Sequence, residues 1–465
     1  MHKKLYSSVL LVASAITLVF AGMSALEDNY FREWRSHQRE YARMTAGKTP
    51  FEPGLRQHFL TELGRIDRCS TCHTGLMNTD MVNAPQPFTA HPGNLLASHQ
   101  PQTYGCSVCH HGQGLATNSA EAHANNPHLH VYWDEPIYSK DFIQASCRTC
   151  HASEWLEANG APLLSGGADL FIKMGCNSCH KTGGVGGSSG PVLDGIGSKP
   201  IAHFPMAHLT GPHTVENWHV QHLLNPQEVV PGSAMRKYAL TPEDATKLSV
   251  YIMSLRDMRI PSALVHSRDS MDRDNPNGEL LYKRNCSGCH DAGLKSRKDE
   301  ILDWMIPAAR HPQMLKAAGP EFIRRTIIEG RPGTPMESWS TESSGLSRKE
   351  IDALVSYIYS NAASEDPEPW AYKAQADVES GKELYNESCK MCHGANGEGG
   401  PKGTRLTHRA LADMPDSFLA ITIRDGRSGT NMNSFREEAD FTDEEIANVV
   451  GYVRELQRKV LEKRP

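Results

Sequence analysis

One pentapeptide, Cys-x-x-Cys-His, recurs six times in this chain of 465 residues and constrains its structure more than any other feature. The six copies together use all 12 cysteines of the chain. Two thiols three positions apart lie on one side of a helical turn, and the histidine next to them can present its imidazole to a group that both thiols hold. Any fold of this chain must therefore hold six such turns.

The pattern is typical of covalent c-type haem attachment, in which both sulfurs bond to haem vinyl groups and the histidine binds the iron. Zinc is one alternative for paired cysteines, but it needs further ligands at finger-like spacing. Disulfides are another, but a bridge across two residues closes no long loop. We therefore expect six haem c groups. The thioether residues are Cys69, Cys72, Cys106, Cys109, Cys147, Cys150, Cys176, Cys179, Cys286, Cys289, Cys389 and Cys392, and the proximal iron ligands are His73, His110, His151, His180, His290 and His393.

Composition narrows the class of protein further. Charged residues make up 22% of the chain, the net charge is −6, and both signs are mixed throughout, without the basic stripe of a nucleic-acid binder. We expect no nucleic-acid partner. The 38 glycines and 28 prolines suit a loop-rich protein whose core is filled partly by porphyrin. Together with the helical repeats described below, we expect a mainly α-helical fold with much irregular loop.

The N-terminus predicts a membrane helix. Lys3 and Lys4 precede an uncharged run from Leu5 to Leu26, which is long enough to cross a bilayer. Met23 weakens the match to a cleavage site, so we favour a retained anchor at residues 1–26 over a cleaved signal. The positive-inside rule then places the haem-bearing part on the periplasmic side of the inner membrane.

Residues 27–158 are expected to form one trihaem module, because three motifs follow one another too closely for separate domains. Its start, residues 27–60, is charged with aromatic residues at helical spacing, and we interpret it as a solvated stalk. Tyr30, Phe31 and Trp34 are expected at the membrane interface.

The three irons of this module each need a sixth ligand, and histidine fits better than methionine. Neither Met77 nor Met81 lies in a recognisable ligand loop. Spare histidines are abundant, among them His58 and His99. We favour His91, His123 and either His128 or His130, with His111 as a substitute; the sequence does not pair them with irons.

After residue 158 three stretches repeat one order, which predicts domains at 159–262, 263–364 and 365–465. Each has a helix with glycine and an aromatic residue, the haem motif, a long loop, a methionine and a capped helix. The loops around Met336 and Met432 share the pattern Gly-Arg-x-Gly-Thr-x-Met-x-Ser-aromatic, and the loop around Met235 is a weaker copy.

The final helix of each stretch has a recognisable start. Ser347 and Thr442 begin capping boxes, and Thr241 places a capping hydroxyl before a proline. Apolar residues then recur at spacings of three and four, which indicates a buried face.

Each of these three stretches resembles a single-haem class I cytochrome c domain. The resemblance implies that Met235, Met336 and Met432 are the distal ligands of the fourth, fifth and sixth haems. Met305 and Met314 are competitors in the second of these domains.

The N-terminal part resembles multihaem cytochrome c subunits associated with bacterial cytochrome bc-type and related quinol-oxidising complexes. The likeness rests on the charged helix with Trp34, the run 65–68 before the first motif, residues 84–92, and Gly112-Gln113-Gly114 after the second motif. His111 stands where a small residue is expected.

A haem with both axial positions filled passes electrons but binds no substrate, so we assign no catalytic residue. We expect an electron-transfer subunit of an oxidoreductase complex, which carries electrons from a membrane quinol-oxidising partner of cytochrome b type to a soluble periplasmic acceptor. Two alternatives stay open: a redox enzyme with one open haem in the trihaem module, and a cleaved, soluble periplasmic carrier.

Overall fold

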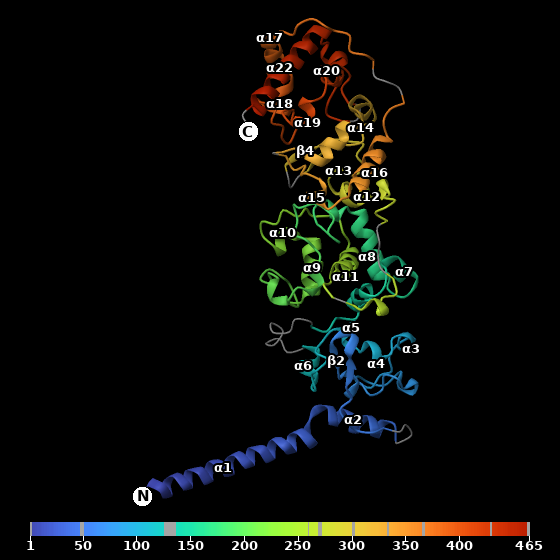
Figure 1. Ribbon diagram of the computed structural model, residues 1–465, viewed down its shortest axis with the longest axis vertical. Helices are drawn as coiled ribbons and strands as arrows, with labels where there is room; N and C mark the ends of the chain where they lie inside the picture. The colour runs from blue at the N-terminus through green and yellow to red at the C-terminus, as the bar shows by residue number, and fades with distance from the viewer. Residues whose placement is uncertain are drawn as a thin grey trace.

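The computed structural model describes residues 2–46, 51–124, 136–258, 260–267, 272–299, 303–332, 334–364, 368–427 and 430–462. Helices and irregular loops make up most of these ranges, as expected. Their named strands form two short antiparallel pairs, β1 (His58–Leu60) with β2 (Arg65–Asp67) and β3 (Arg297–Asp299) with β4 (Trp304–Ile306). Figure 1 shows an elongated molecule in which successive segments follow one another along the long axis.

Helix α1 (His2–Leu26) projects from the N-terminal end of the molecule (Figure 1), and its described side chains from Leu5 onward are exposed. Its 25 residues would span about 37 Å at 1.5 Å per residue. Length and composition thus suit a membrane span, although a signal sequence near the N-terminus has the same properties. Tyr30 and Phe31, in η1 (Glu27–Phe31), are exposed beside it.

Helix α2 (Glu33–Met44) is not the solvated stalk that the sequence suggested. Trp34, Gln38 and Tyr41 lie on one face at spacings of four and three and are all buried. The Gln38 amide donates to the carbonyls of Gly54 (2.7 Å) and Thr71 (2.9 Å), and Thr71 lies inside the first haem motif. The helix is therefore part of the trihaem module, and Trp34 is a core residue rather than a membrane-interface residue.

The other described residues of the predicted trihaem module, apart from β1 and β2, form short helical segments between loops. These are η2 (Thr61–Leu63), η3 (Cys69–Thr71), η4 (Thr79–Met81), α3 (Leu95–Ser98), α4 (Pro101–Tyr104), α5 (Ser107–His110), α6 (Ser119–His123), η6 (Phe142–Thr149) and α7 (Ser153–Ala158).

Each C-terminal stretch is built around two crossing helices. The pairs are α8 (Pro162–Lys173) with α11 (Pro242–Met253), α12 (Gly278–Asn285) with α16 (Arg348–Tyr359), and α17 (Val378–Leu384) with α22 (Asp443–Leu461). A glycine of the first helix lies against the second helix in every pair. A Cβ on Gly167, Gly278 or Gly381 would lie 2.1, 2.2 or 1.9 Å from a backbone carbonyl oxygen of the partner helix. The glycines thus permit the close crossing.

Further helices complete these stretches and frame the loops. They are η7 (Cys176–Ser178), η8 (Ile196–Ser198), η9 (Ile201–His203), α9 (Val215–Leu224), α10 (Pro226–Val229), η10 (Ser262–Leu264), α13 (Ser287–His290), α14 (Pro312–Glu329), α15 (Thr341–Ser344), η11 (Tyr385–Cys389), α18 (Lys390–His393), α19 (Arg409–Ala412), α20 (Asp416–Asp425) and α21 (Phe435–Ala439).

The expected caps are confirmed, and a third capping box is present. Ser347 with Glu350 and Thr442 with Glu445 form boxes at the starts of α16 and α22. Thr241 forms one with Asp244 at the start of α11. The predicted apolar faces of α16 and α22 are buried, as the side chains of Ile351, Leu354, Val355, Ile358, Ile446, Val449, Val450 and Val453 show.

Two adjacent glycines of α8 allow a test of the crossing. Gly167→Ala should destabilise the protein by about 1–3 kcal/mol, because its Cβ would meet the Lys247 carbonyl and the helices would have to separate. Gly166→Ala should be neutral or stabilising by up to about 1 kcal/mol, since only the flexible Lys247 side chain lies near its Cβ. Denaturant unfolding of both variants measures the difference, and equal stabilities would contradict this account of the crossing.

Candidate haem sites

The Cys-x-x-Cys-His motifs adopt a common backbone turn. In five of them the histidine N–H donates to the carbonyl of the first cysteine, at 2.9–3.0 Å for His73, His110, His151, His180 and His290. All 12 cysteines lie in the described ranges and none is disulfide-bonded. The turn directs both sulfurs and the imidazole to one ligand, as covalent haem attachment requires.

Three proximal histidines are oriented by backbone carbonyls. The Nδ1 atoms of His180, His290 and His393 lie 2.8, 3.1 and 2.7 Å from the carbonyl oxygens of Pro191, Pro307 and Thr404. An Nδ1–H that donates to a carbonyl leaves Nε2 with its lone pair free for iron. These imidazoles are therefore held in the tautomer that a haem iron needs.

The three predicted methionine loops share one hydrogen-bond pattern, although the first is the weakest sequence match. In each loop the methionine N–H donates to a hydroxyl two residues earlier, at 3.1–3.2 Å. The pairs are Met235 with Ser233, Met336 with Thr334 and Met432 with Thr430. The N–H of that hydroxyl residue donates in turn to the carbonyl of Val230, Arg331 or Arg427, at 3.0 Å in all three. Structurally, the loop around Met235 is thus equivalent to the other two.

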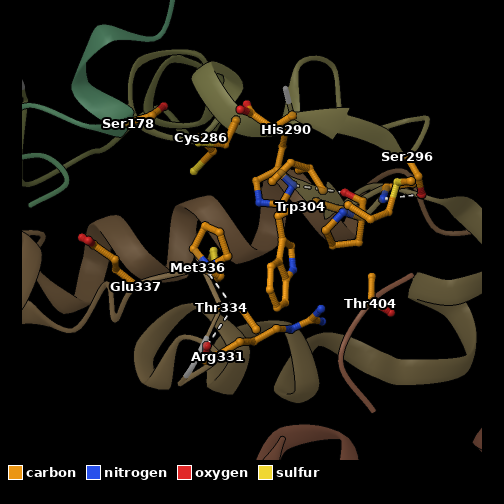
Figure 2. Close-up of a pocket in the computed structure, with 18 of the residues that line it drawn as sticks. Ser178, Cys286, His290, Ser296, Trp304, Arg331, Thr334, Met336, Glu337 and Thr404 are labelled. Atoms are coloured by element: carbon orange, nitrogen blue, oxygen red, sulfur yellow. Dashed lines mark hydrogen bonds between the residues drawn. The ribbon is translucent and has the colours of Figure 1, made fainter. Parts of the chain in front are cut away.

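One cavity of about 1000 Å³ joins the three C-terminal motifs. Its lining contains all six of their cysteines and the pairs His180 with Met235, His290 with Met336, and His393 with Met432. Figure 2 shows His290, Trp304, Arg331 and Met336 among the side chains that line it. The donor set and the largely apolar walls fit a row of porphyrins held between histidine and methionine. The competitors Met305 and Met314 also line the cavity.

In the trihaem module, three histidine pairs have the spacing of two ligands on one iron. Ring centres are 6.0 Å apart for His73 and His123, 6.3 Å for His91 and His110, and 6.0 Å for His99 and His151. Two imidazoles on opposite sides of one metal have centres about 6 Å apart, because each metal–nitrogen bond is about 2 Å long. His91 and His99 also place Nδ1 3.0 and 3.1 Å from the carbonyls of Pro92 and Leu95, which leaves Nε2 for a metal.

Other parts of the fold position these distal histidines. His123 ends α6, whose first residue, Ser119, donates its N–H (3.0 Å) and hydroxyl (2.6 Å) to the Glu33 carboxylate. Helix α2 therefore helps to place His123 opposite His73.

One of the candidate histidines lies elsewhere, two fall outside the described residues, and His99 was not among the favoured ones. His111 packs on Tyr138 with ring centres 3.7 Å apart and faces none of the proximal imidazoles in the described ranges. His128 and His130 lie outside the described residues. His99 was not favoured, because no local pattern distinguishes it from His58, which contacts Ser70 instead. His266 also lies near His151, but at 5.1 Å between ring centres it is too close for an opposed pair.

Asp67 joins the first two motifs, a role that the sequence did not suggest. Its side chain is fully buried, and its carboxylate accepts hydrogen bonds from the N–H groups of Cys69 (3.0 Å), Cys106 (2.9 Å) and Ser107 (2.8 Å). Burial acts to raise the pKa of Asp67, but these backbone donors outweigh it and hold the pKa below its usual value. The Cys69 and Cys106 sulfurs and a carboxylate oxygen of Asp67 lie within 4.8 Å of one another. The first two haem motifs are therefore close together.

Asp67→Asn should destabilise the protein by about 2–4 kcal/mol, because the amide replaces a charged acceptor by a donor facing backbone N–H groups. In the native protein the depressed pKa contributes stability above about pH 4, the usual carboxyl pKa, and this contribution is lost as the pH falls through the folded-state pKa. Unfolding measured between pH 3 and 7 checks both points. The exposed Asp80→Asn is the control, and equal pH dependence in both variants would refute the role of Asp67.

Neighbouring motifs contact one another directly. The Asp67 carboxylate accepts hydrogen bonds from the N–H groups of both Cys69 and Cys106, and the Gly288 N–H of the fifth motif donates to the Ser178 hydroxyl of the fourth motif. The Ser146 hydroxyl donates to the Cys109 carbonyl at 2.8 Å and so links the second motif to the segment that leads into the third. These contacts bring together motifs one and two, two and three, and four and five.

The fourth and fifth motifs pack through glycine. A Cβ on Gly288 would lie 2.4 Å from the Gly175 carbonyl oxygen, and the Gly288 N–H donates to the Ser178 hydroxyl at 3.1 Å. Motifs three and four share one hydrophobic core, since Cys147 and Cys176 both pack against it. Motifs five and six line the common cavity.

The sequence matches two family models. The model described as cytochrome c matches residues 164–256, and the model described as cytochrome c oxidase, cbb3-type, subunit III matches residues 273–358 and 376–453. Each matched range contains one haem motif and its methionine loop.

Curated relatives match part of the chain. Cbb3-type cytochrome c oxidase subunit CcoP is 26% identical over 198 residues in an Azospirillum species and over 196 residues in Azospirillum brasilense, which is 38% of this chain and 61% of each relative. Dihydro-heme d1 dehydrogenase of Pseudomonas aeruginosa is 33% identical over 82 residues, 18% of this chain and 14% of that protein. The matched region thus spans less than two thirds of the length of the Azospirillum relatives.

One solved structure, a reducing HAO-like protein complex of Kuenenia stuttgartiensis, is similar over 40% of this chain and 99% of that chain, with 20% identity and a TM-score of 0.27. Because this structural similarity is low, the assignment of the chain to a family rests on the family models. Residues 164–256, 273–358 and 376–453 are cytochrome c domains, and the chain is a multihaem c-type cytochrome that transfers electrons through covalently bound haem.

Proposed function

We propose that the chain is a six-haem electron conduit, anchored in the inner membrane by α1, which receives electrons from a quinol-oxidising membrane partner and delivers them to a soluble periplasmic acceptor. The observation that carries the proposal is the continuity of the motifs. Hydrogen bonds, a shared core and a shared cavity connect each motif with the next. Their order along the long axis follows the chain (Figure 1).

The proposed axial ligands of the six haems imply a direction of electron transfer. The first three haems would have histidine on both sides, from His73 and His123, His110 and His91, and His151 and His99. The last three would have Met235, Met336 and Met432 opposite their proximal histidines. Methionine ligation raises the potential of a haem relative to histidine ligation. Electrons would therefore run downhill from the anchored end to the C-terminal domain.

The partners follow from likeness. The N-terminal resemblance favours a cytochrome b-type quinol-oxidising donor, and the Azospirillum relatives are by name subunits of an oxidase, which favours a place in a respiratory complex. The anchor keeps the conduit beside its donor. N-terminal sequencing of the mature protein tests the anchor, because a cleaved terminus would make the protein a soluble carrier.

Haem counting and ligand binding test the conduit itself. The purified protein should carry six covalent haems by mass, show low-spin signals alone in its paramagnetic resonance spectrum, and leave its reduced spectrum unchanged under carbon monoxide. Fewer than six haems would refute the conduit. A high-spin haem that binds carbon monoxide would favour a redox enzyme with an open site in the trihaem module.

A further inference from the structure

In each cytochrome c domain one helix precedes the methionine loop and packs against the last helix of the domain. The pairs are α9 with α11, α14 with α16, and α20 with α22 (Figure 1). Residues at positions i, i+1, i+4 and i+5 of α9, α14 and α20 line the cavity. They are Trp218, His219, His222 and Leu223 in α9, Phe322, Ile323, Thr326 and Ile327 in α14, and Phe418, Leu419, Thr422 and Ile423 in α20. The three helices therefore occupy equivalent places beside the fourth, fifth and sixth motifs.

Helix α9 differs from the other two at the two inner positions of this pattern. His219 stands where α14 and α20 have an aliphatic residue, and His222 stands where they have threonine. Nε2 of His219 and Nδ1 of His222 are buried and have no hydrogen-bond partner among the described residues. Burial of a polar nitrogen without a partner costs free energy. The first domain thus carries two imidazoles in a cavity wall that the other two domains build without any.

His222 lies near the proximal ligand of the fourth haem. Its ring stacks on that of Trp218, with centres 4.6 Å and planes 13° apart, and the Trp218 Nε1–H donates to the Pro205 carbonyl at 3.1 Å. Burial and the charge of His180 together lower the pKa of His222 to about 4. His222 is therefore neutral at pH 7, which is the form of imidazole that binds metals.

His219 is less well placed for the same iron. Its ring packs against those of Phe204 and Trp218, with centres 5.5 and 5.2 Å apart. Burial lowers the pKa of His219 to about 3, and the charged groups that add to this shift are His222 and Lys199 rather than His180. Of the two histidines, His222 is thus the one whose surroundings include the proximal ligand.

The cavity beside His180 is consequently lined by two possible iron ligands, the Met235 thioether and the His222 imidazole. We propose that His222 is a reserve distal ligand of the fourth haem and binds its iron when Met235 leaves. The exchange breaks one iron–sulfur bond and forms one iron–nitrogen bond. It transfers no electron and releases no proton, because the imidazole is already neutral. The inference rests on the proposed function for the placement of the fourth haem on His180.

The exchange would change the potential of the fourth haem while keeping its iron six-coordinate. Methionine ligation raises the potential of a haem relative to histidine ligation. With His222 bound, the fourth haem would therefore move from the potential of the C-terminal haems toward that of the trihaem module. Its motif lies between these two groups in the chain, so its distal ligand would govern electron transfer from one group to the other.

Met235→Leu and Met432→Leu in the full-length protein form a matched test. Met235→Leu should show one additional haem with two imidazole ligands by paramagnetic resonance, a lower midpoint potential for that haem, and no carbon monoxide binding. Met432→Leu should bind carbon monoxide at one haem in six, because Thr422 stands in place of His222. The double variant Met235→Leu/His222→Thr should also bind carbon monoxide at one haem, since the reserve ligand is lost.

Carbon monoxide binding by Met235→Leu, with six haems retained, would overturn the proposal. A fourth haem that opens in Met235→Leu/His219→Leu but stays closed in Met235→Leu/His222→Thr would overturn it as well and would assign the role to His219. If Met235→Leu loses haem, Met235→Gln, which keeps the length of the side chain, is compared with Met432→Gln by the same measurements. A wild-type protein without haem on the fourth motif would refute the proposed function itself, which haem counting by mass detects separately.

Discussion

Met336→His should lower the midpoint potential of one haem by about 0.2 V, a fraction of the roughly 0.8 V over which axial ligands set haem potentials. A thioether sulfur favours ferrous iron, whereas a second imidazole favours the ferric state. Met336 has the required surroundings, since its N–H is fixed by Thr334 at 3.2 Å and its loop lines the cavity that His290 also lines. Optical redox titration of the full-length protein measures the shift.

Met305 provides the matched control for this substitution. It lines the same cavity but comes from β4, where its N–H donates to the Gly400 carbonyl at 3.1 Å. Met305→Leu should leave all midpoint potentials within about 0.05 V of wild type, because only a neighbouring apolar contact changes. A large shift for Met305→Leu together with none for Met336→His would assign the ligand to Met305.

His99→Ala should open one haem of the proposed trihaem module. Removal of the imidazole opposite His151 leaves the third iron five-coordinate, so the variant should show a high-spin signal and bind carbon monoxide at one haem in six. The wild-type protein should do neither. Absorption spectra of the reduced protein before and after addition of carbon monoxide provide the measurement.

His266→Ala separates the two histidines that lie near His151. Its ring centre is 5.1 Å from that of His151 and lies closer still to that of Trp155, at 4.6 Å. The substitution should therefore leave the iron six-coordinate. Carbon monoxide binding by His266→Ala, with none by His99→Ala, would assign the distal position to His266.

The sequence predicted the features that local spacing determines. Mainly helical structure followed from the repeated stretches, and the capping boxes at Ser347 and Thr442 followed from side chains three residues apart. The buried faces of α16 and α22 followed from apolar periodicity. Each of these features depends on residues within one or two helical turns, so no knowledge of the tertiary structure was needed.

Features that depend on distant segments were missed. Helix α2 was interpreted as solvated because its residues are charged, yet Gln38 bonds to Thr71, 33 residues away. Asp67 joins the motifs at Cys69 and Cys106, and nothing near Asp67 in the sequence indicates the second partner. His99 could be found only by its position opposite His151.

The equivalence of the three methionine loops was predicted only in part from the sequence. The sequence around Met235 lacks the Gly-Thr pair of the other two, so the match appeared weak. Ser233 supplies the same hydroxyl acceptor as Thr334 and Thr430, because backbone geometry constrains this turn more than residue identity does. The same comparison shows one difference in the first domain: it has Val230 five residues before the methionine, where the other two domains have Arg331 and Arg427.

A redox titration of the full-length protein, followed by paramagnetic resonance at each potential, tests the central claim most directly. The account predicts three haems with two histidine ligands that titrate at low potential and three with histidine and methionine that titrate at higher potential. Electrons would then flow from the trihaem module to the C-terminal domains. C-terminal haems that titrate below the N-terminal three would contradict this direction.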